Sequence, residues 1–290
     1  MKFRTYEEGD YELLRGFLIR LAQQGDEYLH WNWGRFEWAV GNWLFNMPFI
    51  QKIGLCFDGD VLVGAAFFDT TFCTCECLLD HEFEFRYPEF VDYAIEELKG
   101  EGNIGVFVND RSQGKVECLS AKGFSEDKES AETMLELDLG QLKDHPLPAG
   151  YHFSPIDSSK EEDKDRVLWV CYQEQICRHI QGGVWLARQK KESPYMNPTL
   201  SIALCDPRGE WIGYVAGWFD PQNDFLHIDP IRVVSKNGPE GLASALVTEL
   251  LRQGKALGAR RAIVLGGLEP YAELGFKPAQ RYALYFKPKA

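Results

Sequence analysis

One stretch, residues 224–276, constrains the fold of this chain more than any other. Residues 225–234 are apolar and rich in β-forming side chains, which predicts a strand. Turn residues follow at 235–241, and leucines then recur at helical spacing over 242–257. A second short apolar run, 261–265, predicts another strand. This order of strand, glycine turn, helix and strand organises the interpretation of the other elements.

The turn between the first strand and the helix is where binding chemistry is expected. Pro239 suits the first turn of a helix, where its missing N–H costs nothing. Gly238 and Gly241 let the backbone approach a ligand without a Cβ in the way. The free N–H groups and the dipole of a helix start make such a turn an anion site. The alternative is an ordinary turn between a strand and a helix, which two glycines alone do not exclude.

Two motifs in this stretch resemble those of the GNAT acyltransferases. In motif A of that family a strand ends at a valine, and the amides of a Gly-x-Gly/Ala turn hold the coenzyme A pyrophosphate. Val233 takes the place of the valine, and Gly241 and Ala243 take the places of the turn residues. Residues 271–276, Tyr-Ala-Glu-Leu-Gly-Phe, resemble the family's later Tyr-x-x-x-Gly-Phe motif. The two motifs occur in the family's order and separation.

The resemblance implies acetyl-CoA as the cofactor, bound where the strand ends and the helix begins. We expect one acetyl-CoA per chain, with its pyrophosphate at the amides of residues 237–243. The residues expected to contact the coenzyme A are Val233, Val234, Lys236, Asn237, Gly238, Pro239, Glu240, Gly241, Leu242 and Ala243. The reaction that the resemblance implies is direct transfer of an acetyl group to an amine.

The same resemblance implies two groups that assist the departure of the thiolate. In the family the tyrosine of the later motif protonates the sulfur, which makes Tyr271 the expected general acid. A phenol with a pKa of about 10 stays protonated at neutral pH. A backbone N–H of the strand stabilises charge on the thioester oxygen in the family, and here it falls near Val233 or Val234. The alternative for Tyr271 is that its ring only packs and its hydroxyl bonds elsewhere.

A base must also take the proton of the amine before the amine can attack. The side chains expected on one face of the strand, by its period of two, are His227, Asp229, Ile231 and Val233. Some family members carry a catalytic glutamate on this strand, and a count back from Gly241 places His227 there. His227 and Asp229 are therefore the candidate bases, since a neutral histidine is competent near pH 7. Deprotonation through water, with no single base, stays open.

The charge of the chain limits its partners. The net charge is −13 and uneven: residues 1–145 carry 13 basic and 28 acidic residues, a net −15, and residues 146–290 carry 18 and 16, a net +2. A chain this acidic repels phosphates, so no nucleic-acid partner is expected. The acidic half could attract a cationic small-molecule or peptide amine, although a solvated acidic surface is the simpler explanation.

Location and metal content are constrained by apolar runs and cysteines. No apolar run reaches the roughly 18 residues of a membrane span. The N-terminus is too polar for a signal peptide, so a cytoplasmic protein without a membrane partner is expected. Cys73, Cys75 and Cys77 alternate, unlike the Cys-x-x-Cys spacing of zinc and redox sites. Free buried thiols and no metal site are therefore expected.

The elements predicted in the first half follow the GNAT order of strand, helix, hairpin and alternating strands and helices, and the second half repeats it. We expect an α/β (α+β) protein of two tandem GNAT-type domains, each a mixed, mostly antiparallel central sheet flanked by helices. The expected domains are residues 1–141 and 151–290. The linker between them is 142–150, whose two prolines and glycine suit neither helix nor strand.

The first half lacks the cofactor motif. No glycine stands between its strand and its helix at residues 84–90. Glu82, Glu84 and Glu89 would repel a pyrophosphate, and Leu119 takes the place of the tyrosine of the later motif. We therefore expect the first half to be a degenerate copy that does not bind acetyl-CoA.

Some local predictions are less constrained by their pattern. A strand is predicted at 73–79, with a further strand at 81–86, and another strand at 134–139. An amphipathic helix is predicted at 161–180. Residues 28–50 hold four of the eight tryptophans, which indicates a helix packed on the sheet or, alternatively, an aromatic cage for a ligand.

These observations favour an acetyl-CoA-dependent N-acetyltransferase that is active in its C-terminal domain on a primary amine. The alternative is a non-catalytic GNAT-fold binding or regulatory protein. Gly238, where the family has Arg or Gln, and Glu240, where it often has a base, favour that alternative. Aminoacyl transfer, as in tandem GNAT-fold enzymes of peptidoglycan synthesis, is a third reading, which the acidic surface disfavours because tRNA would be repelled. Neither the acceptor nor the oligomeric state follows from the sequence.

Overall fold

The chain folds into two compact units. The computed structural model describes residues 2–41, 50–69, 74–99, 103–157, 160, 162–163, 165–167, 169–170, 195–234, 239–269 and 271–288. The first unit comprises Met1–Ala39, Trp43–Met134 and Ala279–Ala290, and the second comprises Val40–Asn42 and Leu135–Pro278. The two units are therefore not simply the two halves of the sequence.

The first unit is a mixed sheet with helices packed on it. Its strands lie in the order β1-β2-β3-β4-β5-β12, in which β4 and β5 run parallel and the other neighbours antiparallel. The elements of this part of the chain are β1 (Lys2–Thr5), η1 (Glu8–Asp10), α1 (Tyr11–Gln24), η2 (Asp26–Tyr28), α2 (Trp33–Gly41), β2 (Gly54–Asp58), β3 (Val61–Asp69), β4 (Thr74–Leu79), η3 (His81–Arg86), α4 (Tyr87–Tyr93), η4 (Ala94–Leu98), β5 (Ile104–Asn109), α5 (Gln113–Ala121), β6 (Ser125–Asp138) and η5 (Leu139–Gln141).

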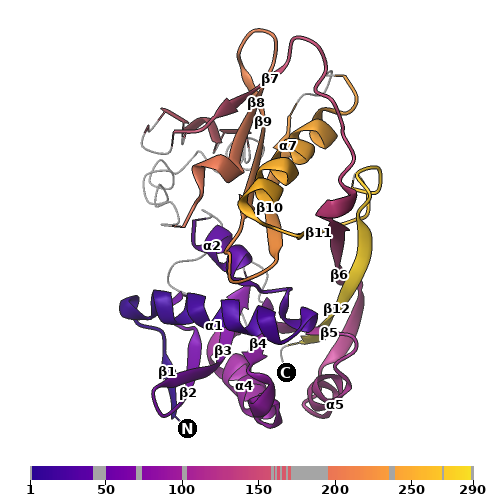
Figure 1. The fold of residues 1–290 in the computed structure, drawn as a ribbon. Coiled ribbons are helices and arrows are strands. Elements are labelled where there is room, and N and C mark those ends of the chain that lie inside the picture. The colour runs from indigo at the N-terminus through magenta and orange to yellow at the C-terminus, as the bar shows by residue number, and fades with distance from the viewer. Residues whose placement is uncertain are drawn as a thin grey trace, which may run out of the picture. The chain divides into compact units, whose positions relative to one another are not determined.

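Apolar faces of the helices close the core of this unit. Helix α1 packs on β3, and α4 packs on both β3 and β4 (Figure 1). Trp31 and Trp33, at or just before the start of α2, are at most 1% exposed, and the Arg35 guanidinium lies 4.9 Å from the Trp31 ring centroid. These two tryptophans therefore pack in the core, as the packed-helix alternative predicts, whereas Trp43 lies outside the described residues.

The strands of the second unit lie in the order β6-β11-β10-β9-β8-β7. Its further elements are β7 (His152–Pro155), η8 (Pro198–Leu200), β8 (Ser201–Cys205), β9 (Trp211–Trp218), β10 (Phe225–Val233), α7 (Leu242–Leu257), β11 (Arg261–Leu265) and β12 (Lys277–Lys287), of which β12 pairs in the first unit. Strands β10 and β11 are parallel, while β7 to β10 are antiparallel. Helix α7 packs on β8, β9 and β10 (Figure 1) and buries leucines such as Leu246 and Leu250.

The units differ from the predicted domains, residues 1–141 and 151–290, by an exchange of strands. The last strand, β12, pairs with β5 of the first unit, from Tyr282↔Asn109 to Lys287↔Ile104. The end of β6 belongs instead to the second unit, where the Leu139 N–H donates to the Arg260 carbonyl at 2.9 Å. Strand pairing of this kind is non-local, so composition and turn signals do not reveal it.

Several local predictions differ from the structure. Residues 81–86 form a 3-10 helix and not a strand. Strand β6 begins at Ser125, well before the predicted 134–139, because its first half is charged and largely exposed and so lacks an apolar pattern. Most of the helix predicted at 161–180 lies outside the described residues. The linker 142–150 has no helix or strand, as predicted.

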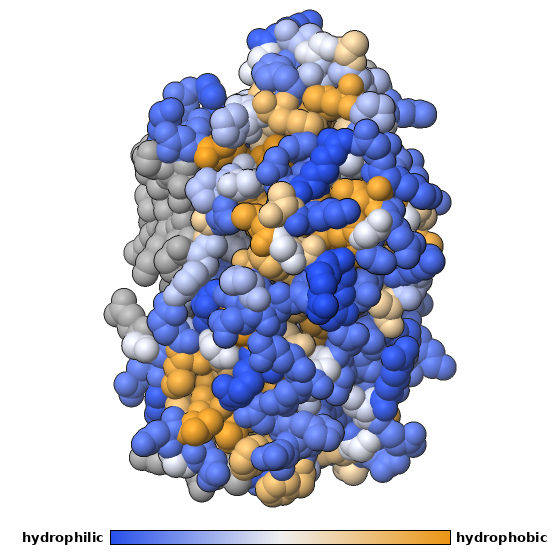
Figure 2. All heavy atoms as spheres, viewed as in Figure 1, coloured by the Kyte–Doolittle hydropathy of each residue, from blue (hydrophilic) through white to orange (hydrophobic). Residues whose placement is uncertain are grey.

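The face seen in Figure 2 is largely hydrophilic, with apolar atoms in separate patches. No helix in the described ranges combines the length and the apolar character that crossing a membrane requires.

Candidate active site

Strands β10 and β11 separate part of the way along their length. Their parallel ladder joins Phe225 to Arg261 and ends at His227↔Ile263. On its other edge β10 stays paired with β9 as far as Val233↔Gly213. The second half of β10 therefore has one edge in the sheet and a second edge beyond the end of the β11 ladder, and we call this second edge of β10 the slot.

A β-bulge lies where the strands separate. Ile228 pairs with Gly217 and Ile231 with Val215, so Asp229 and Pro230 together oppose one residue of β9. The Asp229–Pro230 peptide is cis. Because proline has no N–H, it cannot continue the ladder at this point. A proline inside a strand pattern is a known sign of a bulge, and this signal could have located it from the sequence.

The bulge corrects the prediction that alternate residues from His227 to Val233 share one face. Ile228 belongs to the core beneath α7, and Ile231 and Val233 pack against that same core. The expected face was therefore wrong for Ile231 and Val233. One extra residue in a strand moves every later side chain to the other face. His227 and Asp229 keep the face opposite α7.

Two backbone N–H groups of β10 point into the slot. The Val234 N–H donates to the Ile212 carbonyl of β9 at 2.8 Å, so it is not available to a thioester oxygen. In an antiparallel ladder, hydrogen-bonded and non-hydrogen-bonded pairs alternate. The N–H groups of Val233 and Ile231 therefore point away from β9, toward the edge that β11 has left. The spacing of the sequence indicated Val233 or Val234 and not Ile231, because the direction of each N–H depends on how β10 pairs with β9.

The structure places His227 near Asp229, and the charge of Asp229 acts on Tyr271. His227 is fully buried, and its Nε2 is 3.9 Å from Asp229 Oδ2. The Asp229 side chain is 28% exposed, so it can meet a ligand. Burial and then the negative charge of Asp229 raise the pKa of Tyr271 to about 12. The Tyr271 ring, 7% exposed, packs edge-on against Phe276 with centroids 5.5 Å apart, which fixes its position.

The start of α7 has the backbone that an anion site requires. Gly241 precedes the helix in the left-handed region, at φ 85°, where a residue without a Cβ is favoured. Among the described residues, apart from its two chain neighbours, none has an atom within 4 Å of the position that a Cβ on Gly241 would take. The first helical bond runs from the Ala245 N–H to the Gly241 carbonyl, so the helix offers no acceptor to the earlier N–H groups, such as those of Leu242 and Ala243.

The rest of the predicted cofactor loop is only partly described. Pro239 and Glu240 are exposed at the helix start. Lys236, Asn237 and Gly238 lie outside the described residues. The described part of the loop fits a pyrophosphate, because it combines open space, unused helix N–H groups and a first helical turn without an acidic residue.

The corresponding turn of the first unit is built differently. Strand β4, parallel to β5, is followed by the 3-10 helix η3 and then by α4. Charged side chains occupy this turn: the Lys115 ammonium is 2.7 Å from Glu84, and the Tyr28 hydroxyl donates to Glu84 at 2.9 Å. The Arg86 guanidinium pairs with Glu89. In this turn charged side chains therefore pair with one another, whereas the corresponding turn of the second unit exposes backbone N–H groups.

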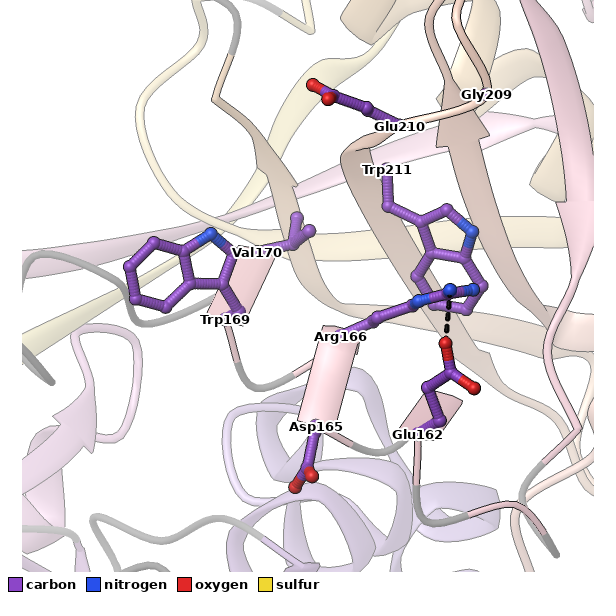
Figure 3. A pocket seen from close by; sticks show the side chains of 8 residues that line it. All are labelled: Glu162, Asp165, Arg166, Trp169, Val170, Gly209, Glu210 and Trp211. Atoms are coloured by element: carbon purple, nitrogen blue, oxygen red, sulfur yellow. Dashed lines mark hydrogen bonds and ion pairs between the residues drawn. The ribbon is translucent and has the colours of Figure 1, made fainter.

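A separate hollow of about 690 Å³ lies at the turn between β8 and β9 (Figure 3). Its lining residues are Glu162, Asp165, Arg166, Trp169, Val170, Gly209, Glu210 and Trp211. The Arg166 guanidinium lies 5.5 Å over the Trp211 ring and pairs with Glu162, as Figure 3 shows. Because its own arginine covers the aromatic wall, and none of the predicted catalytic residues lines it, this hollow is not assigned to the reaction.

The described cysteines are not arranged as a metal site. Cys75 and Cys77 are buried and carry no disulfide, while Cys73 lies outside the described residues. Within the described ranges, no group of three or more His, Cys, Asp or Glu side chains is placed to hold a metal ion.

Comparisons with known proteins agree with this geometry. Residues 152–276 match the family model described as the Acetyltransferase (GNAT) family. No curated protein matches the chain by sequence. The matched residues include β10, the bulge, the start of α7 and Tyr271, so the second half of the chain carries a GNAT domain.

Solved structures match over nearly the whole chain. A tandem GNAT protein from the clavulanic acid biosynthesis pathway, solved without AcCoA, is 13% identical with a TM-score of 0.62, covering 99% of this chain and 98% of that one. A GCN5-related N-acetyltransferase from Sphaerobacter thermophilus is 15% identical, with a TM-score of 0.57 and coverage of 99% and 95%. L-PGS from Bacillus licheniformis is 15% identical, with a TM-score of 0.51 and coverage of 99% and 93%. The predicted fold class, two tandem GNAT-type domains, is confirmed.

Proposed function

We propose that this protein, with its tandem GNAT fold and its GNAT domain at residues 152–276, transfers the acetyl group of acetyl-CoA to a primary amine in the second unit. The observation that carries the proposal is the slot beside β10, which has Tyr271 and Asp229 near its bulge and Gly241 at the helix start that follows. Fold alone does not imply this function, but a binding slot and an acid–base set in one place support it.

Backbone groups of the second unit would hold the coenzyme. The N–H groups of Leu242 and Ala243 at the start of α7 suit the pyrophosphate. Those of Ile231 and Val233 line the slot, and the one beside the bulge is placed to stabilise charge on a thioester oxygen. When bound, acetyl-CoA supplies an acetyl group activated as a thioester.

Tyr271 is suited to act as the general acid. Its raised pKa, about 12, keeps the hydroxyl protonated across the physiological range, so a proton is always available at Oη for the departing sulfur. The packing of the ring on Phe276 limits its motion and so keeps that proton in one place.

The candidate general bases are His227 and Asp229. The Asp229 carboxylate is partly exposed, so it can accept a hydrogen bond from the ammonium group of an acceptor. His227 is buried behind it, 3.9 Å away, and can accept the proton in turn. A carboxylate next to a histidine also favours the approach of a cationic amine.

The alternative is a GNAT-fold protein that binds a ligand without transferring an acetyl group. Glu240 supports it, because a carboxylate at the start of α7 repels phosphate groups. The two functions differ in whether a thiol is released, and calorimetry and kinetics therefore separate them.

The experiment has two parts. Calorimetry with acetyl-CoA should give one site per chain, and a panel of primary amines should then be screened for release of free thiol. Binding without release for every amine would favour the non-catalytic alternative. Two sites per chain, or no binding at all, would overturn the assignment of the cofactor site.

A further inference from the structure

The carbonyl of Asp229 has an unusual partner. It lies in the bulge, where two residues of β10 oppose one of β9 and where the β11 ladder has already ended. A bulge leaves backbone groups without ladder partners. The indole N–H of Trp218 donates to this carbonyl at 2.7 Å, so a side chain supplies the bond that the sheet does not.

Trp218 is placed to do this by the register of the sheet. It pairs directly with His227 across the antiparallel ladder, so the two side chains leave the sheet on the same face. Its ring is 2% exposed and therefore held by packing. From this position the indole reaches two residues along β10 to the bulge. Trp218 is thus paired with His227 in the sheet and hydrogen-bonded to Asp229, and these two residues are the candidate bases.

We propose that Trp218 is a positioning residue, whose indole N–H holds the bulge so that the Asp229 carboxylate stays beside His227. The carbonyl and the side chain of Asp229 leave the same Cα, so fixing one restricts the direction of the other. The catalytic consequence rests on the proposed function. The positioning itself is a property of the protein without any ligand.

A purely structural role for Trp218 makes a different prediction. If the ring only fills space, a ring of the same shape without the N–H should leave Asp229 where it is. If the hydrogen bond positions Asp229, removing the N–H should weaken the effect of the Asp229 charge on Tyr271. That charge is one of the two causes that raise the pKa of Tyr271, and burial is the larger.

The test compares two tryptophans on the same strand. Trp218→Phe removes the donor, and Trp211→Phe, whose ring lies against Arg166 at the other end of β9, is the matched control. The protein is labelled with 3-fluorotyrosine, and the Tyr271 signal is assigned by its loss in Tyr271→Phe. The pH titration of that fluorine signal reports the ionisation of Tyr271 without any cofactor, and Asp229→Asn calibrates how much of the pKa the carboxylate contributes.

We expect Trp218→Phe to lower the pKa of Tyr271 in the same direction as Asp229→Asn, and Trp211→Phe to leave it unchanged. With an active acceptor, kcat of Trp218→Phe should fall about tenfold, since small misplacements of a catalytic group are costly. KM for acetyl-CoA should stay within about twofold, because the pyrophosphate contacts at the start of α7 lie elsewhere. The acid limb of the pH–rate profile should move as well.

The outcomes are distinct. An unchanged Tyr271 titration in Trp218→Phe would overturn the positioning role, whether or not the protein is an enzyme. A shifted titration in an active protein whose kcat is unchanged would overturn its role in the reaction. If the wild type transfers no acetyl group, the proposed function fails while the titration still decides the positioning. Should Trp218→Phe not fold, benzothienylalanine at position 218 keeps the shape of the ring and removes only the N–H.

Discussion

The two units have the same strand order, but the turn that follows β10 in the second unit differs from the turn that follows β4 in the first. After β10 the chain reaches a left-handed Gly241 and the bare start of α7. After β4 it enters the 3-10 helix η3, where Glu84 pairs with Lys115 and Arg86 with Glu89. Exposed backbone N–H groups bind anions, whereas paired side chains bind one another. The same fold can therefore present a cofactor site in one unit and a closed turn in the other.

The buried histidines extend the comparison. In the first unit His30 lies between Glu76 and Glu132, with Glu132 2.8 Å from Nε2. The Phe107 and Tyr282 rings pack beside it, with centroids 4.7 and 4.5 Å away. In the second unit His227 has Asp229 at 3.9 Å, and that carboxylate is partly exposed. In this closed network both ring nitrogens of His30 have a carboxylate partner, which suits a structural role, whereas His227 has one carboxylate 3.9 Å from one ring nitrogen, which suits proton transfer.

Charge within the closed network is set by its neighbours. Burial lowers the pKa of His30, and Arg35 lowers it too, but Glu76 and the hydrogen bonds of both carboxylates outweigh them and raise it. Burial raises the pKa of Glu132, but its bonds to His30 and Arg35 prevail and lower it to about 2. The network therefore favours an imidazolium between two carboxylates.

The largest expected effect comes from filling the open turn. Gly241→Val should weaken acetyl-CoA binding by about 1,000-fold, roughly 4 kcal/mol, because a branched side chain would take the space of the pyrophosphate. Gly123→Val in the first unit is the matched control, since its φ of 84° and its open surroundings equal those of Gly241 at 85°. Calorimetry that gave equal affinity for both variants would place the pyrophosphate elsewhere.

Next in size is the loss of the closed network. His30→Gln should destabilise the first unit by about 3 kcal/mol, because it leaves the buried carboxylate of Glu76 without its cation. Urea unfolding measures this, and His152→Gln, at an exposed position of β7, should change stability by less than about 0.5 kcal/mol. Acetyl-CoA binding should survive in both variants. A His30→Gln variant as stable as the wild type would contradict the structural role of the network.

The pH dependence of this network has a definite sign. The pKa of Glu132 is lowered to about 2, so its stabilisation is present above the unfolded value and is lost as pH falls from about 4.5 toward 2. The pKa of His30 is raised, so its stabilisation is present below about 6.5 and is lost as pH rises through the folded value.

The open pair should matter for turnover and not for stability. Asp229→Asn or His227→Gln should lower kcat by at least about 100-fold, the lower end of what a general base contributes. Affinity for acetyl-CoA should change little. A pH–rate profile is the measurement, and its acid limb should be lost in the variant that removes the base. Profiles equal to the wild type in both variants would leave water as the proton acceptor.

The smallest expected effect belongs to the general acid. Tyr271→Phe should lower kcat by about 10- to 100-fold. The effect is modest because a thiolate is a good leaving group and needs less protonation by an acid than an alkoxide would. Tyr214→Phe, which removes a buried hydroxyl 3.1 Å from that of Ser201, should leave kcat unchanged. Because the pKa of Tyr271 is about 12, the wild-type profile should show no loss from this group below about pH 11. Full activity of Tyr271→Phe with a slow acceptor would exclude the role.

Much of the second unit could be predicted from its sequence. Apolar periodicity located β10, α7 and β11, and the proposed roles of Gly241 and Tyr271 came from motif spacing. These features are local, because a strand, a helix and a turn each follow from neighbouring residues. The charged turn at 84–90 was likewise visible as a run without glycine, although the sequence suggested a strand where η3 lies.

The tertiary structure alone decided the rest. The exchange of β6 and β12 depends on which strands they pair with, and no local pattern encodes that choice. The bulge at Asp229 reverses the face of every later residue of β10, so the Ile231 and Val233 side chains pack against the core beneath α7. The hydrogen-bond partner of Trp218 lies on β10, and the partners of His30 lie on β4, β6 and α2. The sequence shows that these residues exist but not that they meet. Periodicity records how each segment meets its own core, whereas hydrogen bonds and ion pairs across the sheet are set only when the segments pack.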